Sequence, residues 1–278
     1  MQRAPIDGIE LEYELRGTGE AVVLIHAGVC ADFFAPLIEQ SALTDRHTVL
    51  RYHRAGYAGS DPVPGALSFE GQAAHCRALM EHAGIERAHI VGHSSSACMA
   101  LQLALDAPEA VQSLALLDAA RPAAPGPTNA EMVRTVVEPA LERFRAGDAE
   151  GAVDVWMRGT CGAGYREPLA QALPHAFAQA VADAGTFFTQ ELPAVMQWTF
   201  GEEEAARVTQ PALAVLGEHS APVFPERREL LLAWLPDVEP FELPGATHLL
   251  HVQQPGAMAV ALLAFFARHP RRGACAAR

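Results

Sequence analysis

Apolar and polar residues follow one another along the chain in patterns that predict a series of β-strands. Residues 9–15 alternate apolar and acidic side chains, which is typical of a strand with one solvated face. Several later strands are predicted from almost uninterrupted apolar runs, as expected for strands buried on both faces of a parallel sheet. The further predicted strands cover residues 21–25, 48–52, 88–91, 111–117, 212–216 and 238–243.

Segments with helical periodicity separate these strands. They cover residues 32–44, 68–83, 97–105, 226–235 and 255–268. Regular alternation of strands and helices is typical of a sheet whose parallel strands are joined by crossover helices. The pattern therefore predicts an α/β fold, with a mostly parallel central sheet and helices on both faces.

The alternation stops at Arg121. A Pro-rich stretch covers residues 121–129, and only helical patterns follow from residue 130 to about residue 207. Such an insertion forms either a cap over a site at the sheet edge or a helical layer elsewhere. Its aromatic and methionine side chains favour a lid that faces an apolar pocket. We therefore expect a core domain of residues 1–121 and 208–278 and a helical cap of residues 122–207.

The stretch Ile90-Val91-Gly92-His93-Ser94-Ser95-Ser96-Ala97 joins a buried strand to a helix. Strand, sharp turn and helix are the setting in which Gly-x-Ser-x-Gly forms a nucleophile elbow, with the central serine in a strained conformation. Gly92 fits the first small position, whereas Ser96 stands where the last Gly would be. The alternative interpretation is a Ser-rich N-cap of a helix that follows a buried strand.

A serine nucleophile requires a base within hydrogen-bond reach. His248 lies in the loop between the last strand and the last helix, from which a side chain can extend over the sheet edge. His251 is the alternative base, although we expect it at the surface or at a helix start. His93 is expected to point away from Ser94 and to be structural.

Four segments carry a resemblance to a known family: residues 26–28, 53–60, 92–96 and 245–248. They are similar to the oxyanion loop, the Asp-x-Arg-Gly-x-Gly-x-Ser turn, the nucleophile elbow and the histidine loop of the α/β-hydrolase fold superfamily. From residue 9 to residue 268 the chain resembles the capped, serine esterase-like branch of that superfamily. Each motif alone has low specificity, but four in this order and spacing are specific.

The resemblance implies that Ser94 attacks a carbonyl carbon while His248 acts as base and then as acid. It also implies an oxyanion hole made by the backbone N–H groups of Ser95 and of Gly28 or Val29. A serine at position 94 excludes branches that use an aspartate nucleophile, such as the epoxide hydrolases and haloalkane dehalogenases.

The third member of the triad is the main departure from the family. Its members usually place an Asp after the strand that follows the cap, where this chain has Ser220. Either Glu218 substitutes from the same loop, or the acid has moved to Asp118. Asp118 ends the strand after the elbow helix, at the carboxyl edge of the sheet where ligand-facing residues gather.

Two features favour Asp118 over Glu218. The chain order Ser94, Asp118, His248 keeps the family's serine–acid–histidine order. The segment Asp118-Ala119-Ala120-Arg121-Pro122 also resembles the equivalent turn of haloalkane dehalogenases that place their acid there. The alternative is that Asp118 only caps the loop into the Pro-rich stretch.

The predicted function is hydrolysis of a small, apolar carboxylic ester through an acyl-enzyme intermediate. A lactonase, thioesterase or carbon–carbon bond hydrolase would use the same triad. A non-catalytic ligand-binding member of the fold is the opposing hypothesis, because Ser96 and Ser220 depart from the family pattern.

Composition narrows the possible partners and location. A formal charge of −13 and a pI near 5.3 argue against binding to nucleic acid or to anionic membranes. Five cysteines without framework spacing indicate free thiols in a reducing compartment. No signal peptide is recognised, and the longest apolar run, residues 257–267, is too short to span a bilayer. We expect a cytoplasmic protein without metal or cofactor, because neither metal-ligand spacing nor a phosphate loop is present.

Overall fold

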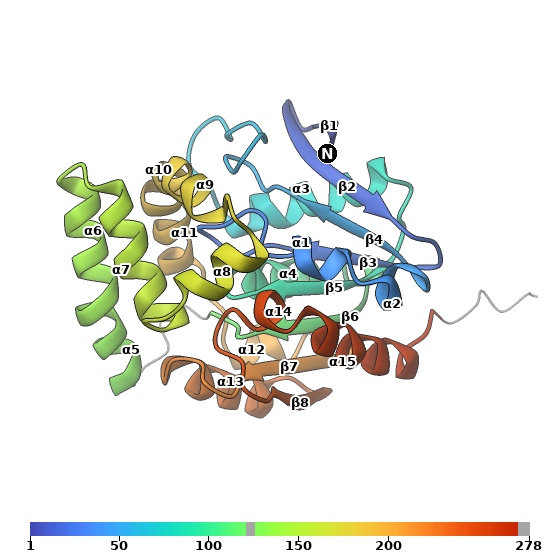
Figure 1. Ribbon diagram of the computed structural model, residues 1–278. Helices are drawn as coiled ribbons and strands as arrows, with labels where there is room; N and C mark the ends of the chain where they lie inside the picture. The colour runs from blue at the N-terminus through green and yellow to red at the C-terminus, as the bar shows by residue number, and fades with distance from the viewer. Residues whose placement is uncertain (121–125, 272–278) are drawn as a thin grey trace, which may run out of the picture.

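The computed structural model describes residues 1–120 and 126–271 (Figure 1). Its centre is an eight-stranded sheet in the order β1-β2-β4-β3-β5-β6-β7-β8, in which β1, β2 and β4 pair antiparallel and β4, β3, β5, β6, β7 and β8 pair parallel. This arrangement confirms the predicted fold class. The strands are β1 (Gln2–Ile6), β2 (Ile9–Arg16), β3 (Glu20–Ile25), β4 (His47–Tyr52), β5 (Ala88–His93), β6 (Val111–Leu117), β7 (Ala212–Gly217) and β8 (Val238–Leu243).

The pattern of the central strands follows from their burial. Every residue of β5, β6 and β7 is buried, so that helices must cover both faces of the sheet there. One face packs against α3 (Phe69–His82), α4 (Ser95–Asp106) and part of α13 (Val223–Trp234). The other face packs against α1 (Ala35–Ile38), α2 (Ser41–Thr44), α14 (Leu250–Gln253) and α15 (Pro255–Arg268).

Two local predictions need correction. The first strand, β1, was not predicted; it pairs with β2 through a two-residue turn in which Asp7 and Gly8 both have positive φ, at 48° and 88°. Such a turn matches the twist of a hairpin, and Asp-Gly is a preferred sequence for it. The helix predicted over residues 32–44 is instead the two short helices α1 and α2, which pack together and against α15.

A second group of helices comes between β6 and β7 in the chain, and we call it the helical insertion; most of it stands to the left of the sheet in Figure 1, and its last helix lies beside β7. It contains α5 (Pro127–Met132), η2 (Val133–Val137), α6 (Glu138–Arg145), α7 (Ala149–Cys161), α8 (Arg166–Ala172), α9 (Ala176–Ala182), α10 (Ala184–Thr186), η3 (Phe187–Glu191), α11 (Leu192–Gln197) and α12 (Glu202–Ala205). The predicted boundary at residues 121 and 122 lies outside the described residues. η2 and η3 are π-helical, a conformation that is frequent at functional sites.

The helical insertion has its own apolar cluster, and that cluster continues onto the loops of the core. It includes Ala27, Val29 and Phe33 from the loop after β3, and Leu249 and Val252 from the segment after β8. The insertion is therefore packed over the carboxyl edge of the parallel strands. Across residues 1–120 and 126–271, none of the helices has the length and apolar character needed to cross a membrane.

Candidate active site

Ser94 sits at the sharp turn between β5 and α4. Its backbone has φ 55° and ψ −120°, outside the regions that L-residues usually adopt. The turn brings strand and helix so close that a Cβ on Gly92 would lie 2.5 Å from the carbonyl oxygen of Ser96. Only glycine fits at position 92, and the half-buried Ser94 side chain is turned toward a cavity.

Ser96, which stands where the family has glycine, is fully buried, and its hydroxyl has partners. Its Oγ accepts a hydrogen bond from the His93 N–H at 2.8 Å and donates to the carbonyl oxygen of Ile25 at the end of β3. The serine therefore connects the elbow with the neighbouring strand rather than distorting the turn.

Asp118 and His248 form a buried pair. Asp118 directly follows β6 and has a positive φ of 41°, and its Oδ2 lies 2.9 Å from Nδ1 of His248. Its Oδ1 accepts a hydrogen bond from the Gly217 N–H at 3.0 Å, and its Oδ2 also accepts one from the Ser220 hydroxyl. Ser220, at the family's usual acid position, thus holds the carboxylate that pairs with the histidine.

The Asp118 turn is joined directly to the elbow. The Ser94 N–H donates to the carbonyl oxygen of Leu117 at 2.8 Å, and the Ala120 N–H donates to the carbonyl oxygen of Ser94 at 2.9 Å. The residues on both sides of Asp118 therefore bind the Ser94 backbone. Arg121 and Pro122, which also carry the resemblance of this turn to dehalogenases, lie outside the described residues.

The alternative acid, Glu218, is placed differently. It is exposed, and its Oε2 accepts a hydrogen bond from the Gly245 N–H at 2.6 Å. Glu218 fixes the start of the histidine loop, whereas the carboxylate hydrogen-bonded to His248 belongs to Asp118.

The rings around His248 hold it in place. Phe224 stacks on its imidazole with centroids 4.1 Å apart, and Nε2 of His93 donates to its backbone carbonyl oxygen at 3.0 Å. Burial, and then the nearby His251, lower the pKa of His93 well below its ordinary value, so that His93 stays neutral. His93 is thus structural, as predicted, and it supports the histidine loop.

His251 was expected at the surface or at a helix start; the surface position is wrong, and the helix start is confirmed. It belongs to α14, is completely buried and stacks on Phe34 with centroids 4.4 Å apart. Within the described part of the chain neither ring nitrogen has a hydrogen-bond partner. Burial, and then the charge of nearby His248, lower the pKa of His251 to about 3.

The candidate oxyanion residues lie on two adjoining segments. The Gly28 N–H donates to the Oγ of Ser95 at 3.1 Å, which joins the loop after β3 to the start of α4. Val29 has φ 74°, and the Cys30 N–H donates across it to the Gly28 carbonyl oxygen at 3.0 Å. A positive φ is a strained conformation for a β-branched residue. In the described residues the N–H groups of Ser95 and Val29 have no hydrogen-bond acceptor.

A buried ion pair beneath this loop was not predicted. Arg54 and Glu191 have fully buried side chains, and Nη2 of Arg54 lies 2.7 Å from Oε2 of Glu191. Burial, the largest influence, lowers the pKa of the Arg54 guanidinium, but the Glu191 carboxylate together with the nearby Tyr57 and Tyr52 raises it above its ordinary value. Removing one partner of such a pair typically costs about 3–5 kcal/mol. The sequence signal was an acidic residue on an apolar helical stretch, beside Phe187, Phe188 and Leu192.

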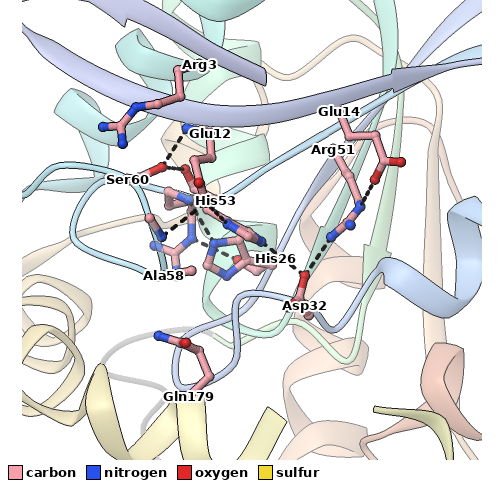
Figure 2. Close-up of polar contacts among 12 residues, drawn as sticks. Arg3, Glu12, Glu14, His26, Asp32, Arg51, His53, Ala58, Ser60 and Gln179 are labelled. Carbon is pink, nitrogen blue, oxygen red and sulfur yellow. Dashed lines mark hydrogen bonds and ion pairs between the residues drawn. The ribbon is translucent and has the colours of Figure 1, made fainter. Parts of the chain in front are cut away.

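A second polar network fixes the other side of the loop (Figure 2). The Nδ1 of His53 lies 2.9 Å from Oε2 of Glu12, and its Nε2 lies 3.1 Å from Oδ1 of Asp32. Arg51 joins Asp32 to Glu14 through two hydrogen bonds of 2.7 Å. The His53 imidazole and, after it, the Arg51 guanidinium hold the pKa of Asp32 below its usual range despite its burial. His53, at the family's Asp position, thus binds two carboxylates.

A cavity of about 80 Å³ lies between Ser94 and the helical insertion. The insertion supplies mostly apolar walls, among them Met132, Val133, Val137, Trp156, Phe187 and Leu192. Polar side chains enter it from Asn129, Thr160 and Arg227. A search of the described ranges found no group of His, Cys, Asp and Glu residues arranged to hold a metal ion.

Comparison with known proteins identifies the fold and several relatives of this chain. Residues 20–153 match the model of the alpha/beta hydrolase fold family. The chain is 36% identical over 116 residues to the dihydrolipoyllysine-residue acetyltransferase component of the acetoin cleaving system of Cupriavidus necator, which covers 42% of this chain and 31% of that protein. The chain thus spans about a third of the length of that relative. It is also 28% identical over 241 residues to a putative carbamate hydrolase of Klebsiella pneumoniae, covering 84% of this chain and 86% of that protein.

Among solved structures, the enol-lactonase of Burkholderia xenovorans LB400 superposes with a TM-score of 0.81 at 22% identity, over 96% of this chain and all of that one. The shared feature is the fold, which in this chain is a mostly parallel eight-stranded sheet with helices on both faces. The chain therefore has the α/β-hydrolase fold, and its residues 20–153 match the model of that family.

Proposed function

We propose that this chain is a serine hydrolase that cleaves a small carboxylic ester through a Ser94–His248–Asp118 triad. The observation that carries the proposal is the buried hydrogen bond of 2.9 Å between His248 and Asp118, whose turn is hydrogen-bonded to the backbone of Ser94 in its strained elbow. A carboxylate on Nδ1 fixes the imidazole in the tautomer whose Nε2 can accept a proton, and it stabilises the imidazolium that forms.

The proposed reaction has two halves. The Ser94 Oγ attacks the ester carbonyl carbon while its proton passes to Nε2 of His248, and the tetrahedral intermediate then releases the alcohol, which takes that proton. Water adds to the acyl-enzyme in the same way, with His248 again as base and then as acid. The products are the carboxylic acid and the free enzyme.

We propose that the negative oxygen of each intermediate is held by the N–H groups of Ser95 and Val29. Gly28 was the first candidate for the second donor, but its N–H already binds the Ser95 hydroxyl. The strained φ of Val29 supports the choice, since strained backbone clusters at functional sites. Loss of one such donor typically costs about 10²–10³-fold in kcat.

The substrate is proposed from the cavity. A volume of about 80 Å³ is far below the roughly 300–1,000 Å³ of pockets for drug-sized ligands, which favours a short acyl or alcohol group. In this proposal the helical insertion is a cap of residues 122–207 that sets the size of that group. A lactone is a cyclic ester, so the same residues would open it. A thioester, or a carbon–carbon bond next to a carbonyl group, remains a related substrate class.

The opposing candidate is a ligand-binding protein that has lost turnover. This alternative was motivated by Ser96, which stands in place of the last glycine of the elbow, and by Ser220, which stands in place of the usual aspartate. Both hydroxyls are hydrogen-bonded in ways that complete the site: Ser96 connects β5 with β3, and Ser220 holds Asp118. These contacts support an active enzyme over a degenerate one.

A labelling experiment tests the proposal. The purified protein is treated with a fluorophosphonate and assayed with p-nitrophenyl acetate, and the labelled residue is mapped by mass spectrometry. Ser94→Ala should abolish labelling and lower turnover by about 10⁴-fold or more, whereas Ser96→Gly should keep the label on Ser94. A label mapped to Ser95 or Ser96 contradicts the assignment. Absence of both labelling and hydrolysis in the wild-type protein favours the ligand-binding alternative.

A further inference from the structure

Glu191 projects from the helical insertion into the core and contacts the segment that carries the candidate oxyanion donors. Its Oε1 accepts a hydrogen bond from the Ser95 hydroxyl at 2.6 Å, and Ser95 Oγ in turn accepts the Gly28 N–H at 3.1 Å. A chain of two hydrogen bonds thus joins the insertion to the turn that contains Val29. Glu191 itself does not line the cavity above Ser94, so it acts through its neighbours.

We propose that Glu191 is a positioning residue that holds the oxyanion turn in its strained conformation through Ser95, so that seating of the helical insertion completes the oxyanion hole. The proposal rests on the proposed function for its effect on turnover. It assigns the insertion a part in building the site, beyond shaping the cavity.

The direction of the hydrogen bonds explains why a carboxylate is needed. A serine hydroxyl has one proton to donate and lone pairs that accept. A carboxylate oxygen can only accept, so the Ser95 hydroxyl donates its hydrogen bond to Glu191. The lone pairs of Ser95 Oγ then remain free to accept from the Gly28 N–H. The strained turn at Val29 is then held from one side by this bond and closed on the other by the bond from Cys30 to Gly28.

The carboxylate is itself fixed by the core. Its Oε2 accepts hydrogen bonds from Nη2 of Arg54 and from the hydroxyl of Tyr57. Burial, and then the Glu191 charge, raise the pKa of Tyr57 well above its ordinary value, so that its hydroxyl stays a donor. Arg54 also donates from Nε to the carbonyl oxygen of His26, and from its backbone N–H to Nε2 of the same residue. The loop of residues 26–29 is therefore held at two places by the two partners of one ion pair. Arg54 binds His26 at its start, and Glu191 binds Gly28 through Ser95.

The helical insertion packs closely against the loop of residues 26–29 and leaves no room for another conformation of its backbone near Gly28. A Cβ on Gly28 would lie 2.6 Å from the ring of Phe187 and 2.8 Å from Oε1 of Glu191. Both residues belong to η3, whose extra residue per turn changes the direction in which its side chains project. Removal of η3 from this place would take away the acceptor of Ser95 and the cover of Gly28 together.

Glu191→Gln tests the direction of the bonds. The Oε2 position receives two donors, one of them a charged guanidinium, so the amide oxygen of glutamine must stand there. The NH2 group then faces Ser95 Oγ and can only donate to it, so the buried Ser95 proton loses the acceptor that it has in the wild-type protein. The Ser95 hydroxyl must therefore reorient, which weakens the connection between position 191 and the oxyanion turn. Ser95→Ala removes the same bond without disturbing the ion pair, and it covers the case in which Glu191→Gln does not fold.

The matched control is Thr186→Val in the same part of the insertion. Thr186 donates to the Gly56 carbonyl oxygen at 2.7 Å, so this variant also loses a contact between insertion and core, but not one with the oxyanion turn. The four proteins are compared by hydrogen–deuterium exchange of peptides covering residues 26–30 and by kcat and KM for p-nitrophenyl acetate.

We expect faster exchange at residues 26–30 in Glu191→Gln and Ser95→Ala, together with a kcat lower by about 10–100-fold at a KM within about threefold, since misplacing a donor costs less than deleting it. Thr186→Val should keep the wild-type exchange rate at residues 26–30 and the wild-type kcat. Unchanged exchange in the two test variants, equal exchange in the control, or an unchanged kcat in an active enzyme overturns the proposal. If the wild-type protein hydrolyses no ester, the proposed function fails, and the exchange data still decide whether Glu191 holds the turn.

Discussion

Replacing Asp118 with asparagine should abolish most of the activity while leaving the fold in place. The structure fixes how the new amide must lie. Oδ1 of Asp118 accepts from the backbone N–H of Gly217, which can never become an acceptor, so the amide oxygen has to occupy that position. The NH2 group is then forced into the place of Oδ2, where it faces Nδ1 of His248.

The magnitude follows from the tautomer that this geometry imposes. With an N–H group in front of it, Nδ1 of His248 must be the unprotonated nitrogen, and the proton moves to Nε2. That nitrogen then cannot take the proton of Ser94. The equivalent change in a serine protease lowers kcat by about 10⁴-fold, which corresponds to about 5.4 kcal/mol of barrier at 1.36 kcal/mol per factor of ten. The Ser220 hydroxyl can turn to accept from the amide, so little stability should be lost.

The assay is kcat for p-nitrophenyl acetate, with thermal unfolding to verify the fold. The control is Glu218→Gln, which changes an exposed carboxylate bound to Gly245 and should keep kcat within about threefold, since surface changes are usually small. If Asp118→Asn keeps kcat within tenfold of wild type and Glu218→Gln is crippling, then the acid lies in the loop after β7 and the reasoning is wrong.

Three further predictions concern the histidines and the cavity. His248→Ala should lose activity by several orders of magnitude, whereas His251→Phe should keep it, and equal loss in both variants would contradict the choice of base. The folded-state pKa of His251, about 3, lies below its ordinary value of 6.5. As the pH falls from 6.5 toward 3, His251 is therefore protonated in the unfolded chain but not in the folded chain. Stability from this residue is complete above pH 6.5 and falls by ~2 kcal/mol at pH 5; denaturant unfolding at pH 7 and pH 5 should show a smaller loss for His251→Phe than for wild type. Val133→Phe, in the partly buried wall of the cavity, should shift the preference from p-nitrophenyl butyrate toward the acetate with little change in Tm, and an unchanged preference would place the acyl group elsewhere.

Most of the sheet could be predicted from the sequence, because its signals are local. A strand buried on both faces is mostly apolar, and the polar residues within β5, β6 and β7 are limited to His89, His93, Gln112 and Ser113. The elbow was also local: Gly92 and Ser94 lie on one turn whose strain and crowding depend on adjacent residues. The missed strand β1 had a local signal as well, the Asp-Gly turn, which the neighbouring alternation of β2 should have extended.

The site required the tertiary structure, since its decisive contacts join distant parts of the chain. Asp118 and His248 are 130 residues apart, and only the parallel register of β6 and β7 brings the Gly217 N–H and Ser220 against the carboxylate. Sequence order could favour Asp118 over Glu218, but it could not exclude either. The role of Ser220 as a donor to the acid is visible only in space.

The burial of polar side chains shows most clearly what the sequence could not predict and the structure reveals. A histidine or a glutamate reads as polar in a sequence, and polar residues are expected at the surface. His251 is nevertheless buried against Phe34, and Glu191 is buried against Arg54, 137 residues away in the chain. A charge can be buried only where a partner of opposite charge meets it, and the meeting of a helical insertion with a loop after β4 is decided by packing. The sequence by itself determined where seven of the eight strands lie along the chain and that a serine stands at the turn after β5. The folded chain decided which carboxylates meet a histidine or an arginine, because those contacts depend on how separate elements pack.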